Sequence, residues 1–310
     1  MKSKFLLSLS VILLSSSLSL TGCSSSDTPK MPEPDVELVP VHFDLRFSGL
    51  NNETTRSLAD GYKFSDGKSI SELKCYVYNA ANGSSSTPIK VENIDIKAVN
   101  DHRGGDISIL LPKGQQFDVV FLGTSIPQTN PTSKLYYNSS DRTLTVNYST
   151  VSCNDEELDC FYAVQTNVKT ETIKENPIEL TRPFAQLNIG TGDYADYNSS
   201  TPVKNIAVTV DGIYNKINLM DGSVVGNPQN ITFQGAALPT GQTFPVNNMT
   251  YLSMNYLLVN TRKLIDLTIT VNHTNSSIPS KVISLESIAV ERNYQTNVYG
   301  KLLLTGELSD

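Results

Sequence analysis

Alternation of apolar and polar side chains constrains the fold of this chain more than any other feature. In the segment VHFDLRF, residues 41–47, every odd position is apolar and every even position is polar. A period of two places the apolar side chains on one face of a β-strand and the polar side chains on the other. The side chains predicted to lie in a core are those of Val41, Phe43, Leu45 and Phe47.

Strand-like segments recur along the rest of the chain. They are predicted at residues 73–79, 107–111, 117–122, 143–148, 161–168, 178–189, 206–210, 213–220, 230–233, 251–259, 264–271 and 281–290. Gly104-Gly105 and Asp211-Gly212 are typical turn signals between strands, and the polar stretch 190–202 is predicted to be a loop. Many short strands with little helical periodicity indicate an all-β protein built from β-sandwiches.

The first 22 residues have the features of an export signal. A basic start is followed by an apolar run that is too short and too rich in serine to span a membrane. The run ends in Leu-Thr-Gly-Cys, which resembles the bacterial lipobox, in which a peptidase cuts before the cysteine and the thiol is lipidated. Cys23 is therefore the predicted mature N-terminus. The alternative is an ordinary secretory signal followed by a chance cysteine.

A lipid on Cys23 would anchor the mature chain, since two or more acyl chains bind a membrane stably. Ser24 stands where an Asp is the usual mark of inner-membrane retention, so the outer membrane is favoured. Residues 23–36 then form a flexible tether.

Length and charge limit the remaining options. About 275 residues follow the tether, which suggests two domains, at 37–179 and 180–310, because a new run of strands begins at Leu180. The formal net charge is −7 and the chain has no basic run. Such a chain is a poor partner for nucleic acid.

Three cysteines remain after Cys23, namely Cys75, Cys153 and Cys160. An odd number leaves at least one thiol free in an oxidising compartment. Residues 154–157, Asn-Asp-Glu-Glu, are typical of a helix start. Along such a helix Cys153 and Cys160 would lie about 10.5 Å apart, too far for a disulfide. The acidic residues of 155–159 are interpreted as a solvated helix face rather than a cation site.

The sequence offers no recognisable catalytic constellation. His42, His102 and His273 are far apart; His42 is predicted to face solvent and His102 to lie in a charged loop. Sequence patterns of zinc proteases, P-loops, serine hydrolases and paired-cysteine zinc sites do not occur. The chain is therefore predicted not to be an enzyme and to need no cofactor or metal.

Tyrosines are the candidates for a sugar-binding surface, because the chain has no tryptophan. Tyr62, Tyr76 and Tyr78 would form an aromatic patch, or else pack half-buried on strands.

Several segments together resemble one family, the fimbrillin-like lipoproteins of Bacteroidales, which are subunits of type V pili. These segments are DCFYAV (159–164), LTRPFAQLNIGT (180–191), LPKGQQFDVVFLGT (111–124), YNKINLMDGSV (214–224) and RNYQTNVYGKLL (292–303). The sequence departs from the family pattern at Cys160, where Ala is usual, and at Phe-Leu-Gly, residues 121–123, where Phe-Trp-Ala is usual. The resemblance runs in order from Cys23 to the C-terminus.

The resemblance implies two tandem transthyretin-like β-sandwich domains and a fimbrial subunit or tip adhesin without catalytic activity. Its partners would be other pilin subunits, the outer membrane and a receptor on a host or bacterial surface. The alternative function is a surface lipoprotein that binds glycans for a nutrient-uptake system.

The resemblance also implies assembly by strand exchange. In the family a protease cuts after an arginine in the loop behind the first strand, and Arg56, followed by Ser57, resembles that residue. The strand at 41–47 would then be exchangeable; the alternative is that Arg56 is an ordinary loop arginine. The last strand-like run, 298–304, is followed by only six residues. If this run pairs within its own domain, the chain is a minor or tip subunit rather than a stalk subunit.

Overall fold

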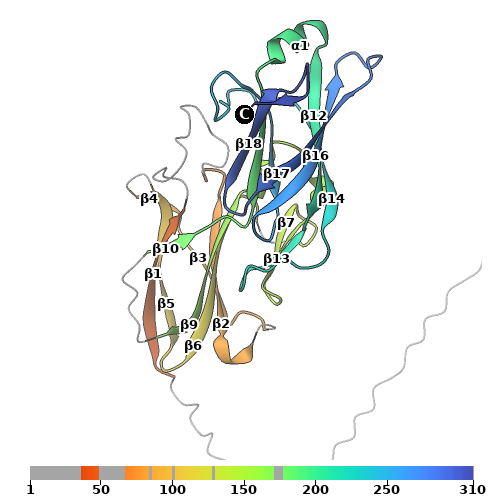
Figure 1. Cartoon of the computed structure of the whole chain (residues 1–310). Coiled ribbons are helices and arrows are strands. Elements are labelled where there is room, and N and C mark those ends of the chain that lie inside the picture. Colours follow the sequence, from red (N-terminus) through yellow and green to blue (C-terminus); the bar gives the residue numbers. More distant parts are fainter. Residues whose placement is uncertain are drawn as a thin grey trace, which may run out of the picture. The chain divides into compact units, whose positions relative to one another are not determined.

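The computed structural model describes residues 36–48, 67–83, 86–99, 102–127, 130–170 and 177–309. The chain divides at Val36, and all described residues after it, from Glu37 on, belong to one compact unit, which is the second unit of the chain. In the described part of the second unit nearly all regular structure is β-strand, with one α-helix, α1 (Tyr194–Ser200) (Figure 1). The predicted all-β class is therefore confirmed. The two tandem transthyretin-like domains, at 37–179 and 180–310, stay a prediction.

Two four-stranded sheets enclose the first hydrophobic core. The β1 sheet has the order β10 (Ile178–Leu180), β1 (Leu38–Phe47), β5 (His102–Pro112), β4 (Lys97–Val99). The β6 sheet has the order β3 (Lys90–Asn93), β2 (Glu72–Asn79), β6 (Gln116–Thr124), β9 (Cys160–Lys169). Side chains from both sheets, such as Leu45 of β1 and Phe121 of β6, belong to the same core.

The strand β6 is buried on both of its faces. Val119 and Phe121 face the first core, whereas the alternate residues Val120 and Leu122 belong to the second core. For this reason β6 reads as a continuous apolar run rather than as an alternating pattern. On this second side lies a small sheet of the order β13 (Lys216–Asn218), β8 (Thr143–Val146), β7 (Leu135–Asn138). Its strand β13 comes from the later half of the sequence.

Two further sheets enclose most of the second core. The β11 sheet has the order β15 (Thr250–Leu257), β11 (Ala185–Thr191), β18 (Gln295–Lys301), β19 (Glu307–Leu308). The β12 sheet has the order β14 (Gln229–Ala236), β12 (Val203–Ile213), β16 (Lys263–His273), β17 (Lys281–Val290). Short 3₁₀ turns are η1 (Ala80–Asn82), η2 (Tyr148–Thr150) and η3 (Glu156–Leu158).

Glycine was a misleading turn signal at two places. The predicted turn at Gly104-Gly105 is wrong, because both residues lie inside β5 opposite Arg46 and Leu45 of β1. A Cβ atom on Gly104 would overlap the carbonyl oxygen of Leu45, so glycine allows the two backbones to approach. His102 likewise begins β5 and does not lie in a loop.

Gly212 lies inside β12 rather than in a turn. Its φ of 74° and the register shift between Val210 and Ile213 are typical of a β-bulge.

The structure differs from the predicted secondary structure in two further segments. The predicted strand 178–189 is two strands, β10 and β11, separated by residues 181–184 around Pro183. The predicted loop 190–202 contains α1. No helix among the described residues has the length and apolar character needed to cross a membrane.

Candidate functional site

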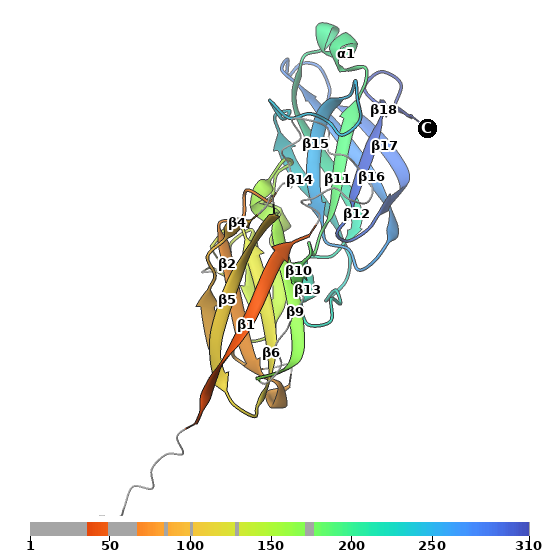
Figure 2. The same ribbon diagram turned by 90° about the vertical axis from the view of Figure 1, so that its left-hand side faces the viewer.

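The first strand, β1, is the predicted site that can be followed in the structure. It runs antiparallel to β5 from Leu38 to Arg46 and parallel to β10 from Leu45 to Phe47 (Figure 2). The side chains of Val41, Phe43, Leu45 and Phe47 are between 1% and 4% exposed, so their predicted burial is confirmed. That this strand is exchangeable stays a prediction.

The two phenylalanines of β1 meet rings of the opposite sheet in different geometries. Phe43 meets Phe121 edge to face, with ring centroids 5.1 Å apart. Phe47 stacks on Phe161, with centroids 4.6 Å apart and planes at 14°. The ring of Phe47 also lies over Gly123, where an added Cβ atom would be 3.4 Å from the ring. The ring of Phe47 thus packs near Gly123 as well as on Phe161.

The outer face of β1 is exposed. His42 faces solvent as predicted, and Arg46 Nη2 lies 3.2 Å from Asp44 Oδ2. Both charged side chains are nearly half exposed, so this ion pair contributes little to stability. The tight contacts of β1 are therefore those of its inner face.

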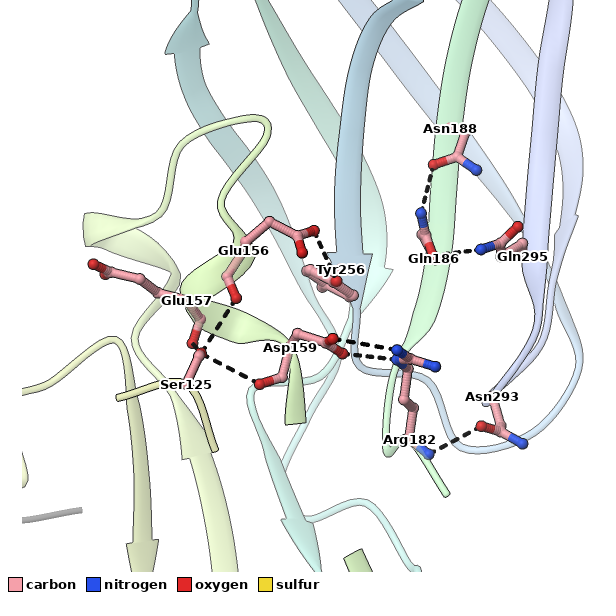
Figure 3. Close-up of polar contacts among 10 residues, drawn as sticks. All are labelled: Ser125, Glu156, Glu157, Asp159, Arg182, Gln186, Asn188, Tyr256, Asn293 and Gln295. Atoms are coloured by element: carbon pink, nitrogen blue, oxygen red, sulfur yellow. Dashed lines mark hydrogen bonds and ion pairs between the residues drawn. The ribbon is translucent and has the colours of Figure 1, made fainter. Parts of the chain in front are cut away.

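A buried ion pair lies where three of the family-like segments meet. Arg182, in the connection between β10 and β11, donates from Nε to Asp159 Oδ1 at 2.7 Å and from Nη2 to Oδ2 at 3.2 Å (Figure 3). Its guanidinium lies 4.0 Å from the centroid of the Phe161 ring. The backbone N–H of Arg182 donates to Asn293 Oδ1 at 2.9 Å. Segments far apart in the sequence are thus joined by one arginine.

Burial and charge oppose each other at Arg182. Burial disfavours the charged guanidinium, but the carboxylate of Asp159 outweighs this effect and raises the pKa of Arg182 above its ordinary value. The pair is therefore held in its ionised form.

The acidic residues 155–159 are not the solvated helix face that was predicted. The helix is a single 3₁₀ turn, η3, which is capped by Asp155. Lys134 Nζ lies 2.7 Å from both Asp155 Oδ2 and Glu157 Oε2, and Tyr256 donates to Glu156 Oε1 at 3.1 Å (Figure 3). Each of these acids therefore has a partner. In the part of the chain that the structure describes, no three His, Cys, Asp or Glu side chains gather as metal ligands would.

Residues 151–154 cover two strand edges, which the sequence analysis missed. Gln234 of β14 exchanges backbone hydrogen bonds with Val151 and Cys153, at 3.0 and 2.9 Å. At the edge of β15, the backbone N–H of Asn154 donates to the carbonyl oxygen of Met254 at 2.8 Å. The N–H of Met254 in turn donates to Asn154 Oδ1 at 2.8 Å. Asn154 has a φ of 65°, a conformation that Asn tolerates better than most residues. An Asn before an acidic run is compatible with this role as well as with a helix cap.

The prediction of an exposed aromatic patch is wrong for Tyr76 and Tyr78. Tyr76 is 6% exposed and Tyr78 is fully buried, so they pack in the core more deeply than the half-buried alternative supposed. The hydroxyl of Tyr78 lies 3.0 Å from that of Tyr137, and the guanidinium of Arg142 lies 4.2 Å from the centre of the Tyr78 ring. Burial raises the pKa of Tyr78 to about 12.

The three cysteines within the described residues, Cys75, Cys153 and Cys160, are free and buried. Burial raises the pKa of Cys153 to about 12 and that of Cys160 well above its ordinary value. Such thiols are poor nucleophiles.

The remaining site predictions lie outside the described residues. They concern Cys23, Arg56, Ser57 and Tyr62.

Comparison with solved structures finds proteins of Bacteroides and Parabacteroides at low sequence identity. A fimbrial assembly protein from Parabacteroides distasonis is 11% identical, with a TM-score of 0.42; the match covers 85% of this chain and 92% of that chain. A candidate adhesin from Bacteroides ovatus is 12% identical, with a TM-score of 0.48, and the match covers 86% and 89%. A candidate polysaccharide-binding protein from Bacteroides thetaiotaomicron is 13% identical, with a TM-score of 0.47, and the match covers 84% and 90%.

The printed names of these similar structures refer to fimbrial assembly, adhesion and polysaccharide binding. No curated protein matches this chain. A family match spans residues 35–309, which is nearly the whole of the second compact unit and includes β1 and the Arg182 ion pair. The chain therefore belongs to the family described as a family of unknown function, DUF6562.

Proposed function

We propose that this protein is a fimbrial subunit or tip adhesin that is exported as a lipoprotein and assembled by strand exchange. The observation that carries the proposal is β1, which lies between β5 and β10 and buries four apolar side chains while its other face is exposed. The protein is thereby proposed to act in assembly and adhesion rather than in catalysis.

Strand exchange is physically reasonable for this groove. Four buried side chains of β1 contribute roughly 6–12 kcal/mol in sum as an upper bound. An empty groove would lose this burial, and an incoming strand with the same alternation would restore most of it. Exchange is then nearly balanced in contacts and is driven by the supply of a donor strand.

The strand β18 bears on the proposed position of the subunit in the fibre. This strand pairs in parallel with β11, and its residue Val298 is 4% exposed in the second core. A strand that is used in this way is not free for donation, which supports a minor or tip subunit. Two tandem β-sandwich domains, 37–179 and 180–310, and anchoring in the outer membrane through lipid on Cys23 belong to the same proposal.

The alternative is a surface glycan-binding lipoprotein. It is less well supported, because Tyr76 and Tyr78 are buried and do not offer their rings to a sugar.

N-terminal sequencing of surface material tests the proposal. We expect mature chains that begin at Ser57, and in the Arg56→Ala variant we expect chains that begin at Cys23 and form no fibres. Arg46→Ala is the matched control, since Arg46 is exposed inside a strand and its loss should leave processing unchanged. Fibres built from chains that begin at Cys23 would show that the Arg56 mechanism is wrong.

Metabolic labelling tests the lipid anchor separately. The Cys23→Ala variant should remain an unprocessed or soluble precursor that takes up no fatty acid. A labelled Cys23→Ala chain would contradict the anchor.

A further inference from the structure

We infer that the groove occupied by β1 selects its incoming strand by two aromatic side chains placed four residues apart, at the positions of Phe43 and Phe47. The partner is an extended segment of a different protein chain that carries aliphatic residues at the positions of Val41 and Leu45. This inference rests on the proposed strand exchange, and it names the chemistry of the donor.

The position of Phe47 is a ring site with stacked geometry. One wall is the Phe161 ring, which stacks on Phe47 with a centroid distance of 4.6 Å and an angle of 14° between the planes. The other contact is the bare backbone of Gly123, with ring atoms at 3.4 Å from where a Cβ atom would stand. A branched aliphatic side chain cannot reproduce the parallel stacking on Phe161, and a smaller side chain would leave a void, which is costly in a core.

The position of Phe43 is a second ring site with a different geometry. Its ring meets Phe121 edge to face, with centroids 5.1 Å apart and planes at 66°. Stacked and edge-to-face pairs are both favourable beyond the apolar area that they bury. Because the two sites differ, two rings of the donor are recognised separately.

Gly104 and Gly105 lie opposite the donor strand between the two ring sites. They pair with Arg46 and Leu45, and a Cβ atom on Gly104 would overlap the carbonyl oxygen of Leu45. The donor backbone therefore approaches β5 most closely just before the second ring site. A slip of one residue would turn the polar side chains of the donor into the core.

Direction is set by the neighbours of the groove. Besides the antiparallel β5, β10 pairs in parallel with Leu45–Phe47, and the Ser48 N–H donates to the Leu180 carbonyl oxygen at 2.8 Å. A donor has to satisfy both neighbours, so it enters in the direction of β1.

The donor is not the last long strand of a second copy of this chain. The strand β18, Gln295–Lys301, has a single aromatic residue, Tyr299, and therefore lacks the aromatic pair. The proposed donor is a strand of a different subunit that carries both rings.

Peptide exchange on the full-length chain tests this inference. A specific protease site is inserted between residues 49 and 66, and after cleavage β1 is held by its contacts alone. A fluorescent peptide with the sequence of residues 37–48 is added, and its incorporation is followed by anisotropy. Placing the substitutions in the peptide keeps the folded protein unchanged.

Incorporation of the substituted peptides is expected to decrease when an aromatic ring is removed. Phe47→Ala or Phe43→Ala should weaken incorporation about 100-fold, and Phe47→Leu about tenfold, because it keeps the apolar volume but loses the ring. The control peptide with Asp44→Asn and Arg46→Gln changes only exposed side chains and should match the parent within about twofold.

The outcomes separate the two claims. If the Phe47→Leu and Phe43→Leu peptides enter as well as the parent peptide, strand exchange stands and ring selection is overturned. If the parent peptide itself never enters the cleaved chain, the proposed strand exchange fails and the inference fails with it.

Discussion

Arg182 brings a positive charge into the interior, where its guanidinium lies between the carboxylate of Asp159 and the ring of Phe161. Transfer of an ion from water to such a site costs several kcal/mol, which the bidentate hydrogen bonds and the ring contact offset. The net contribution of the complete pair to stability is therefore small. The loss of one partner is a different matter, because the remaining charge stays buried without compensation.

Single and double substitutions should reveal this asymmetry. Arg182→Met or Asp159→Leu alone should lower the free energy of unfolding by about 3–5 kcal/mol, whereas the double variant should recover most of that loss. The exposed pair of Arg46 and Asp44 serves as the control, and Arg46→Ala should cost less than about 1 kcal/mol. Guanidinium denaturation measures all four variants. Single variants as stable as the parent would show that the pair is not effectively buried.

Among the elements, long alternating or apolar strands were readable from the sequence. The strand β17 has the bounds 281–290 that its pattern predicted, and β1 was recognised by its period of two. The short strand β3, Lys90–Asn93, was missed because it is a half-buried edge strand with little apolar content. The strand β18, Gln295–Lys301, was located only in part, by the strand-like run 298–304, because its first residues are polar and the strand is stabilised by parallel pairing with β11, about a hundred residues away.

The candidate site was predictable only in part, because some of its contacts join segments that are far apart in the sequence. The inner face of β1 is local information, and its four positions could be read directly. The ion pair of Arg182 and Asp159 depends on the meeting of two separate segments, although a charged residue at the border of each apolar run was a usable signal. Gly104 was misread, because a glycine that permits close packing looks the same in sequence as one that makes a turn.

Substitution of Gly104 tests that role within β5. A methyl group there would overlap the carbonyl oxygen of Leu45, so Gly104→Ala should separate β1 from β5 and cost about 1–3 kcal/mol or more. Ser108→Ala, at an exposed position of the same strand opposite His42, should change stability by less than about 0.5 kcal/mol. Hydrogen exchange of the β1 amides, with thermal melts, compares the two variants. If the β1 amides are equally protected from exchange in the Gly104→Ala and Ser108→Ala variants, close approach of β1 and β5 at Gly104 is not required.

At the scale of the whole molecule, the second core extends beyond the later half of the chain. Tyr76 and Tyr78 of β2 belong to it together with residues of β7, β8 and the β11 and β12 sheets. The strand β13 pairs with β8, so a sheet as well as a core joins early and late parts of the sequence. We therefore expect the described parts of Glu37–Asp310 to unfold in one cooperative transition.

Alkaline titration tests this cooperativity, because the second core contains several buried tyrosines. Burial raises the pKa of Tyr78 to about 12, and it also raises the pKa values of Tyr137 and Tyr148. The folded state therefore holds these phenol protons more tightly than the unfolded state, whose tyrosines ionise near pH 10. This contribution to stability is complete below about pH 10 and is lost as the pH rises toward about 12.

We expect the native circular dichroism to persist to about pH 10 and then to collapse in a single step between about pH 10 and 12. The absorbance of ionised tyrosine at 295 nm should rise sharply in the same step, because unfolding exposes the buried phenols. Tyr294 is 58% exposed and lies outside the buried set, so Tyr294→Phe should leave the step unmoved. Two separate steps would contradict the shared core. Smooth ionisation of all tyrosines before any loss of dichroism would contradict the burial that raises their pKa values.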